Sequence, residues 1–275
     1  MSFTPVVPLA GYAGWRFLGR TREAQEAALV ATPAVQRAET YFRETIGSIT
    51  TAEDLVADRR LLQVALDAFG LGDDIDNRFF IRKVLEDGTL SSDALANKLA
   101  DKRYLAFSKA FGFGDYATPR TVLSDFADTI LGQYEAQVFE KAVGEQSEDM
   151  RLAMNAEREL AALAGRDISD DTKWYSVMGS TPLRTVFQTA LGLPSGFVAL
   201  DLDQQLATLR ERSEAVFGDS EVTQFSAPEN VEKLVRLFLV RSEVAANSSV
   251  YSAQATALTL LQSSQARGGL LSRRV

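Results

Sequence analysis

Hydrophobic positions along this 275-residue chain recur at the spacing of helix faces rather than of strands. One stripe with four-residue steps is made of Val122, Phe126, Ile130, Tyr134 and Val138. Apolar side chains at such intervals line one face of an α-helix, so we expect a long helix over about residues 119–143. The sequence has no alternating run of β-branched residues beside a hairpin turn, which would indicate strands. The pattern therefore predicts an all-α fold.

The same spacing predicts helices over most of the chain. Their approximate ranges are 20–30, 33–47, 52–57, 59–69, 76–87, 92–99, 102–111, 119–143, 148–164, 171–178, 182–191, 201–216, 228–245 and 248–265. Thr followed by Pro at 32–33, 118–119 and 181–182 indicates helix starts, since Thr can bond free backbone N–H groups and Pro fits the first turn. Capping-box spacing is found in two pairs, Ser226 with Glu229 and Thr51 with Asp54.

A short phrase occurs three times, and each copy ends in glycine. The copies run from Asp58 to Gly70, from Asp101 to Gly112 and from Ser180 to Gly192, and an apolar residue follows each glycine. A glycine just beyond a helix end takes the left-handed conformation at little cost, and the next apolar residue packs back on the helix. We therefore interpret each phrase as a helix capped at both ends. A phosphate-binding loop would instead need its glycines at a helix start.

The repeated phrase also indicates an internal duplication, with units at roughly residues 33–116 and 119–245. The glycines at 70, 112 and 192 are separated by 42 and 80 residues (112 − 70 and 192 − 112). A solenoid needs an even period because each unit buries its face on the next. The prediction is a compact multihelical domain over residues 20–245, not a regular solenoid.

The two ends of the chain differ from this helical middle. Residues 1–19 mix Pro and Gly with apolar side chains, which predicts an irregular N-terminal arm, either packed on the core or acting as a docking peptide. Exposed aromatic side chains often mark interfaces, and the candidate partner-contact residues are Tyr12, Trp15, Phe17 and Leu18. Residues 246–275 are rich in Ser, Gln and Ala and predict a weak helical or flexible C-terminal tail that frays or orders on a partner.

The composition argues against several classes of function. A net charge of −8 and a pI near 4.8 disfavour binding to nucleic acid and to anionic membranes. The chain has no Cys and no His, so it cannot supply a disulfide, a thiolate zinc site or a Ser-His-Asp triad. We find no signal-peptide pattern and no apolar run of membrane-spanning length. We therefore expect a soluble protein, either cytoplasmic or exported without a cleaved signal peptide.

The acidic segment Asp73-Asp74-Ile75-Asp76 is the strongest lead to an enzyme. All-α terpenoid synthases hold magnesium with an aspartate-rich DDxxD segment, because hard cations prefer carboxylates. Here Asn77 stands where the last Asp should be, and a second metal-binding segment is missing. Acidic residues at a first helical turn also favour the helix dipole. We therefore predict no catalytic, cofactor-binding or metal-binding residue and no small-molecule substrate, and keep a magnesium-dependent all-α enzyme as a remote alternative.

The order of the phrases resembles an uncharacterised family of alphaproteobacterial flagellum-associated proteins, a domain of unknown function. The matching segments are 5–15, 41–42, 58–70, 101–112, 139–145, 150–155, 182–194 and 201–206. Together they extend over about residues 3–245, and their order carries the resemblance because each phrase is unspecific alone. The resemblance implies a multihelical fold and a flagellar setting, and it implies no catalytic residue.

These observations lead to a function hypothesis without catalysis. We expect a structural or assembly factor associated with the bacterial flagellum that acts through protein–protein contacts, with flagellar components as its partners. Axial flagellar proteins are also often acidic, free of Cys and without a cleaved signal. The alternative is a cytoplasmic all-α regulatory or chaperone-like binding module.

Overall fold

A computed structural model describes residues 3–247, and in this part of the chain every regular element is helical. The α-helices are α1 (Gly11–Val30), α2 (Pro33–Thr45), α3 (Ala52–Ala57), α4 (Arg59–Asp67), α5 (Arg78–Asp87), α6 (Leu95–Lys98), α7 (Arg103–Phe111), α8 (Phe126–Gly144), α9 (Glu148–Ala164), α10 (Asp170–Gly179), α11 (Thr181–Leu191) and α12 (Leu202–Phe217). Short 3-10 turns are η1 (Ile46–Ser48), η2 (Gly72–Asp74), η3 (Arg120–Val122), η4 (Ser195–Ala199) and η5 (Val222–Ser226). Residues 228–247 form a further helix, here called the C-terminal helix. The all-α prediction is confirmed.

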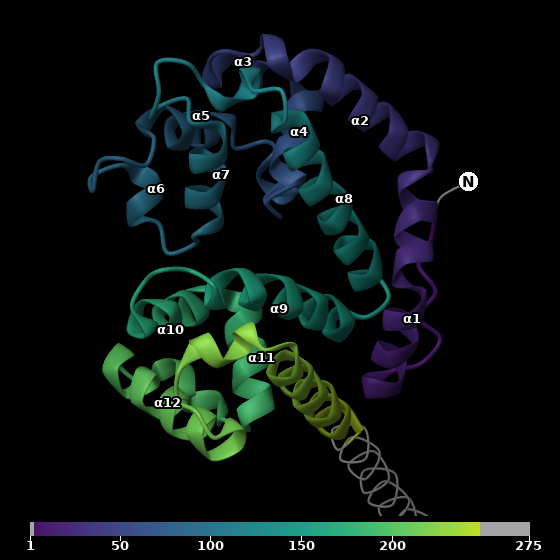
Figure 1. Cartoon of the computed structure of the whole chain (residues 1–275), viewed down its shortest axis with the longest axis vertical. Coiled ribbons are helices and arrows are strands. Elements are labelled where there is room, and N and C mark those ends of the chain that lie inside the picture. Colours follow the sequence, from purple (N-terminus) through teal and green to yellow (C-terminus); the bar gives the residue numbers. More distant parts are fainter. Residues whose placement is uncertain (1–2, 248–275) are drawn as a thin grey trace, which may run out of the picture.

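The helices form two lobes connected by α8 (Figure 1). The first lobe holds α2 to α7, where α2 packs on α4 and α3 packs on α4 and α5. The second lobe holds α9 to α12, η5 and the C-terminal helix, with α9 packed against η5 and α11. Helix α8 contacts α4 in the first lobe and α9 in the second, and α1 lies along both α8 and α9. One hydrophobic core runs through both lobes, which supports the prediction of a compact multihelical domain.

The three predicted glycine stops are confirmed. Gly70, Gly112 and Gly192 have φ values of 68°, 69° and 65°. Beyond Gly70, the N–H of Leu71 bonds to the carbonyl of Leu66 at 2.8 Å, and the Leu193 N–H bonds in the same way to that of Gln188. These bonds are those of the Schellman motif, which satisfies the free carbonyls of a helix end. Gly112 uses the simpler bond from its own N–H to the Ser108 carbonyl.

The helix starts follow the predictions less uniformly. Asp58 caps α4, as expected, and Thr51 accepts the Asp54 N–H at 3.1 Å to cap α3. In the third phrase the capping side chain is Ser180, one residue before the predicted Thr181-Pro182 start. Ser226 bonds back to the Thr223 carbonyl and so closes η5, and the predicted capping box does not form.

The long helix begins at Phe126, seven residues after the predicted start at 119. The Thr121 hydroxyl donates to the Ile49 carbonyl at 2.6 Å and is buried. This bond holds the chain in the turn η3 beside η1. Val122 is consequently 44% exposed and does not belong to the buried stripe. A hydrogen bond to a distant residue has here overridden local helical spacing.

The N-terminal helix begins earlier than predicted. Residues 11–19 belong to α1, so the irregular arm comprises residues 3–10 of the described chain. The arm lies directly on α1, because a Cβ placed on Gly14 would come within 1.9 Å of the Leu9 carbonyl oxygen. Gln25 fixes the arm by accepting the Val6 N–H at 2.6 Å and donating to the Val6 carbonyl at 3.2 Å. The glycines that indicated irregular chain thus permit the arm and the helix to approach closely.

The remaining predictions on chain organisation concern the duplication and the tail. The units at roughly 33–116 and 119–245 stay a prediction. Most of the C-terminal tail predicted for residues 246–275 lies outside the described residues, as does the helix expected at 248–265. Residues 246 and 247 continue the C-terminal helix.

Candidate functional site

The N-terminal helix and the C-terminal helix meet at one corner of the molecule (Figure 1). The Tyr12 hydroxyl donates to the Glu232 carboxylate at 2.8 Å, and Arg16 pairs with the same carboxylate at 3.0 Å. The Arg236 guanidinium lies 5.9 Å from the centre of the Tyr12 ring. Two turns further along the helix, Glu243 lies against Gly11. We call this region, residues 9–16 with residues 232–247, the terminal corner.

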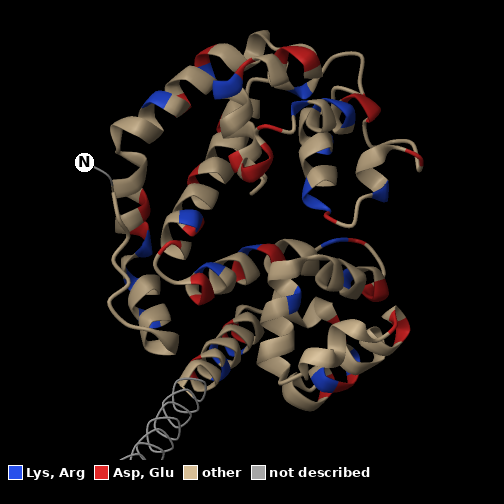
Figure 2. Ribbon diagram, turned by 180° about the vertical axis from the view of Figure 1, so that it is seen from behind, with Lys and Arg blue, Asp and Glu red and all other residues tan. Residues whose placement is uncertain are grey.

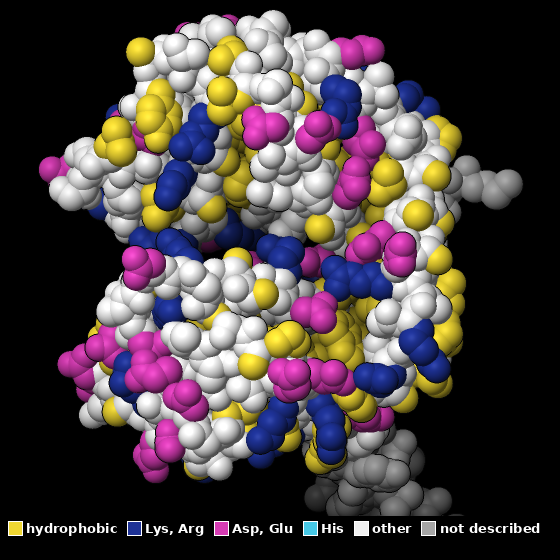
Figure 3. All heavy atoms as spheres, in the orientation of Figure 1, with side chains coloured by type: hydrophobic (Ala, Val, Ile, Leu, Met, Phe, Trp, Pro, Cys, Tyr) yellow, Lys and Arg dark blue, Asp and Glu magenta, His cyan; other side chains and the backbone are white. Residues whose placement is uncertain are grey.

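Exposed apolar side chains belong to both segments of the terminal corner. In the arm, Leu9 is 52% exposed. On the C-terminal helix, Val240 and Val244 are 43% and 63% exposed and share one face, since they are four residues apart. The space-filling view shows hydrophobic side chains along α1 and between α1 and α9 (Figure 3). Sequence reasoning missed the two valines because the buried stripe of the same helix dominated its pattern.

The four predicted contact residues have different surroundings. Leu18 is 1% exposed and belongs to the core, which removes it from the candidate contact residues. Tyr12 and Trp15 are partly buried against the core, and Phe17 is partly buried as well. The structure therefore brings Tyr12 to the terminal corner, whereas Leu18 faces inward because it lies one helical turn after the buried Gly14.

The polar contacts of the terminal corner are solvent-accessible. The hydrogen bond to Glu232, with burial and the charge of that carboxylate, raises the pKa of Tyr12. Side chains of Arg16 and Glu232 are 61% and 50% exposed, and ion pairs of this kind contribute little to stability. The polar contacts set the orientation of the two helices, while buried residues such as Leu234 and Phe238 attach the C-terminal helix to the core.

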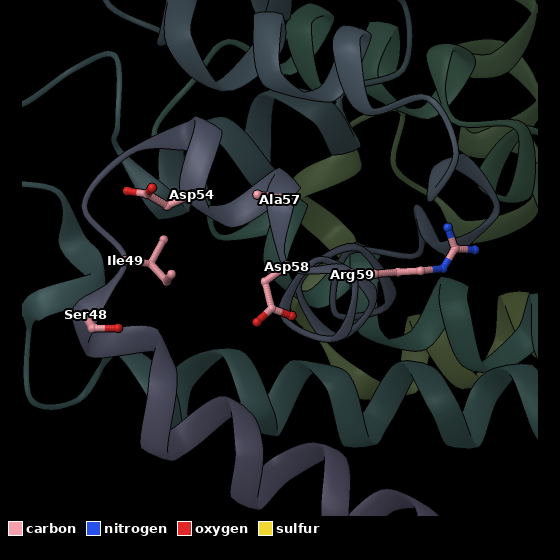
Figure 4. A pocket seen from close by; sticks show the side chains of 6 residues that line it. All are labelled: Ser48, Ile49, Asp54, Ala57, Asp58 and Arg59. Atoms are coloured by element: carbon pink, nitrogen blue, oxygen red, sulfur yellow. The ribbon is translucent and has the colours of Figure 1, made fainter.

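An open depression of about 640 Å³ lies where α3 ends and α4 begins (Figure 4). Its lining residues are Ser48, Ile49, Asp54, Ala57, Asp58 and Arg59. Asp58 accepts the N–H groups of Arg60 and Leu61 and the Tyr41 hydroxyl at 2.5 Å. Burial raises the pKa of Asp58, but the bonds from Tyr41, Leu61 and Arg60 outweigh it and hold this pKa below its ordinary value.

The bonds to Asp58 are those of a helix cap reinforced by a neighbouring helix. Arg60 stacks over the Tyr41 ring at 3.6 Å, which completes the connection between α2 and α4. Figure 4 shows Arg59 extending away from the other lining side chains. The depression thus presents a carboxylate already engaged with the fold.

The acidic segment that suggested magnesium directs its carboxylates to separate partners. Asp74 accepts the Tyr104 hydroxyl at 2.5 Å, and Asp76 pairs with Arg59 at 2.7 Å. Asp73 is exposed. Within residues 3–247, we find no group of three or more acidic side chains that could hold a metal ion. The magnesium alternative therefore gains no support from the arrangement of this segment.

Two further surface properties bear on partners. Basic and acidic side chains are interspersed along the helices of both lobes (Figure 2). Over the described residues, no helix has both the length and the hydropathy needed to cross a bilayer.

Comparison with known proteins identifies the family. A family model described as a protein of unknown function (DUF1217) matches residues 68–231, which is more than half of the chain. A crystal structure of a protein from Agrobacterium tumefaciens, determined in a structural genomics programme, is 29% identical with a TM-score of 0.70. The match covers 87% of this chain and 98% of the Agrobacterium chain. The search of curated proteins found no match. The chain therefore belongs to the DUF1217 family.

Proposed function

We propose that this member of the DUF1217 family is a non-enzymatic structural or assembly factor associated with the bacterial flagellum. It acts through protein–protein contacts at the terminal corner. The observation that carries the proposal is the meeting of the start of α1 with the C-terminal helix, where exposed apolar side chains lie beside weak polar contacts.

The exposed valines give the terminal corner the character of a contact surface. Val240 and Val244 form an apolar strip on the outer side of the C-terminal helix, and Leu9 precedes the Gly11 that lies against Glu243. Burying an apolar side chain of this size is worth about 1.5–3 kcal/mol. A partner that covered the strip would therefore gain affinity without any change in the core.

The flagellar setting rests on two further supports. The order of phrases in the sequence resembles alphaproteobacterial flagellum-associated proteins, as described above. The similar crystal structure comes from Agrobacterium, which is an alphaproteobacterium. An acidic chain without Cys is also similar in composition to axial flagellar proteins.

The test combines localisation with two surface substitutions. A tagged copy expressed from its own promoter should co-purify with flagellar structures, and deletion of the gene should impair swimming or filament assembly. The double variant Val240→Ser with Val244→Ser should fold normally and lose this association. Val122→Ser is the matched control, because Val122 is 44% exposed on η3, which packs beside η1 in the first lobe.

Three results would contradict the proposal or part of it. Normal flagella and normal swimming in the deletion strain would exclude a structural or assembly role. Recovery of the protein only from cytosol, bound to an unassembled flagellar subunit, would favour the chaperone-like alternative. Equal loss of association in the control variant would show that the terminal corner has no special role.

A further inference from the structure

The C-terminal helix has an outer side that the described part of the chain does not cover. Its inner residues Leu234, Phe238 and Leu239 are at most 1% exposed. Beyond Leu239 no residue up to 247 is buried, and the helix leads away from the second lobe (Figure 1). Val240 and Val244 lie on this last section, so both valines remain accessible to another molecule.

The carboxylates of this helix lie away from the two valines. Glu232 is engaged by two side chains of α1, as described above. Glu243 lies against Gly11, because a Cβ placed on this glycine would come within 2.2 Å of the Glu243 Oε2. Both carboxylates are thus directed to α1. The remaining one, Glu229, lies about three turns before Val240.

Two arginines adjoin the valines, and neither forms an ion pair within residues 3–247. Arg236 precedes Val240 by four residues, and Arg241 precedes Val244 by three. Residues at these intervals are neighbours on a helix surface. Both arginine side chains are exposed. The outer side therefore combines an apolar strip with two cations that lack a carboxylate.

Both guanidinium groups are oriented by uncharged parts of the fold. That of Arg236 lies 5.9 Å from the centre of the Tyr12 ring, an arrangement that favours a cation. That of Arg241 lies over Gly192, just beyond the end of α11, where the helix dipole also favours a cation. An oriented guanidinium loses little freedom when it binds a carboxylate, and its N–H groups match the two carboxylate oxygens.

This basic and apolar surface contrasts with the charge of the whole chain. The net charge is −8, whereas the outer side between residues 236 and 244 presents cations. Complementary charge fixes the orientation of a partner and excludes partners of the wrong sign. The surface therefore fits a segment whose apolar face is flanked by carboxylates. An anionic membrane is less suited, because it repels the chain as a whole.

We propose that the outer side of the C-terminal helix binds an acidic amphipathic helix of a partner protein. The apolar face of that helix covers Val240 and Val244, and its carboxylates bond to Arg236 and Arg241. This inference rests on the proposed function, because it states the chemistry of the partner that the terminal corner takes. The flanking cations supply selectivity, while the valines supply the buried apolar area.

A pair of synthetic peptides tests the charge of the partner. Both peptides are helical and carry the same leucine face, which is flanked by Glu in one and by Lys in the other. Their binding to the full chain is measured by fluorescence anisotropy. The Glu peptide should bind more tightly, and Arg236→Gln and Arg241→Gln should each weaken its binding by about fivefold. Added salt should reduce the preference, because exposed charges are screened.

Arg78→Gln is the matched control. Arg78 is also exposed and precedes the exposed Phe79 on α5 in the first lobe. This variant should bind the Glu peptide as the wild type does. The proposal is overturned if the Lys peptide binds as well as the Glu peptide, or if neither Arg236→Gln nor Arg241→Gln weakens binding.

Two other occupants of this surface are separate outcomes. Self-association of the wild type that Val240→Ser with Val244→Ser abolishes would place a second copy on the surface. Binding to vesicles of anionic phospholipid that the two arginine variants lose would assign the surface to a membrane. Either result overturns the proposal. These measurements use the purified chain alone, so their failure is distinct from a failure of flagellar association, which the deletion strain and the tagged copy test.

Discussion

Two ion pairs of similar length lie in different regions of the molecule. Arg158 and Glu140 are 2.7 Å apart at the junction of α8 and α9, and the Glu140 side chain is 3% exposed. Arg16 and Glu232 are 3.0 Å apart at the terminal corner, where both side chains are at least half exposed. Coulomb attraction is strong where water is excluded and weak where it is not. The junction is thus built to hold the lobes together, whereas the terminal corner can exchange its contacts.

Removing the Arg158 cation from the junction of α8 and α9 should have the largest effect on the free energy of unfolding. Arg158→Met leaves Glu140 buried without its ion-pair partner and should lower the free energy of unfolding by about 3 kcal/mol. Arg16→Met at the terminal corner should cost less than about 1 kcal/mol. Denaturant unfolding of both variants measures the difference. Similar losses in the two would refute the contrast between the regions.

A double variant sharpens the interpretation of the junction. Arg158→Met combined with Glu140→Leu removes the unpaired charge together with its partner. Replacing a buried pair by apolar residues is often nearly neutral, so this variant should recover most of the stability lost in Arg158→Met. Failure to recover would mean that packing, not the buried charge, explains the first loss.

Disturbing the attachment of the N-terminal arm to α1 should cause the next largest loss of stability. Gly14→Ala places a Cβ against the Leu9 backbone, so the arm must shift, and we expect a loss of about 1–3 kcal/mol. Gly19 is the control on the same helix, because its added Cβ would meet nothing within 4 Å. Gly19→Ala should instead stabilise the protein by about 0.5–1 kcal/mol. Thermal unfolding of both variants distinguishes close packing from helix propensity.

Removing the Asp58 cap of α4 should cause the smallest loss of stability, and this loss should depend on pH. Asp58→Ala should cost about 1 kcal/mol near neutral pH, as for other lost caps. Because the pKa of Asp58 is lowered in the folded chain, this contribution is present above the ordinary pKa of an aspartate and is lost as pH falls through the lowered value. Unfolding curves of variant and wild type should therefore converge in acid.

A capping control completes this prediction. Asp58→Asn keeps an oxygen that can accept the N–H groups of Arg60 and Leu61 but removes the ionisable group. It should lose less stability than Asp58→Ala near neutral pH and should keep that stability on acidification. A loss equal to that of the alanine variant would assign the effect to the Tyr41 bond instead of the cap.

The features that could be predicted from the sequence are those set by neighbouring residues. The left-handed Gly70, Gly112 and Gly192 follow from local chemistry, as does the Asp58 cap. The start of α8 could not be predicted in this way, because it depends on the bond from Thr121 to Ile49, 72 residues earlier.

The candidate contact surface was predictable only in part. The apolar arm directed attention to Tyr12, but its partner Glu232 is 220 residues away. Leu18 faces the core because of its position around the axis of α1. The sequence predicted an irregular arm over residues 1–19, and the direction of a side chain cannot be predicted for an irregular segment.

The separation of Tyr12 from Glu232 has a consequence for biosynthesis. Helix α1 leaves the ribosome before the other described helices, yet the helices α8 and α9 that it packs against are made after the whole first lobe. Contacts between distant parts of a chain form late because a long loop must close, and synthesis proceeds at only about 5–20 residues per second. The face of α1 that packs on α8 and α9 is therefore uncovered for several seconds in each nascent chain, and α1 needs protection from aggregation during that time.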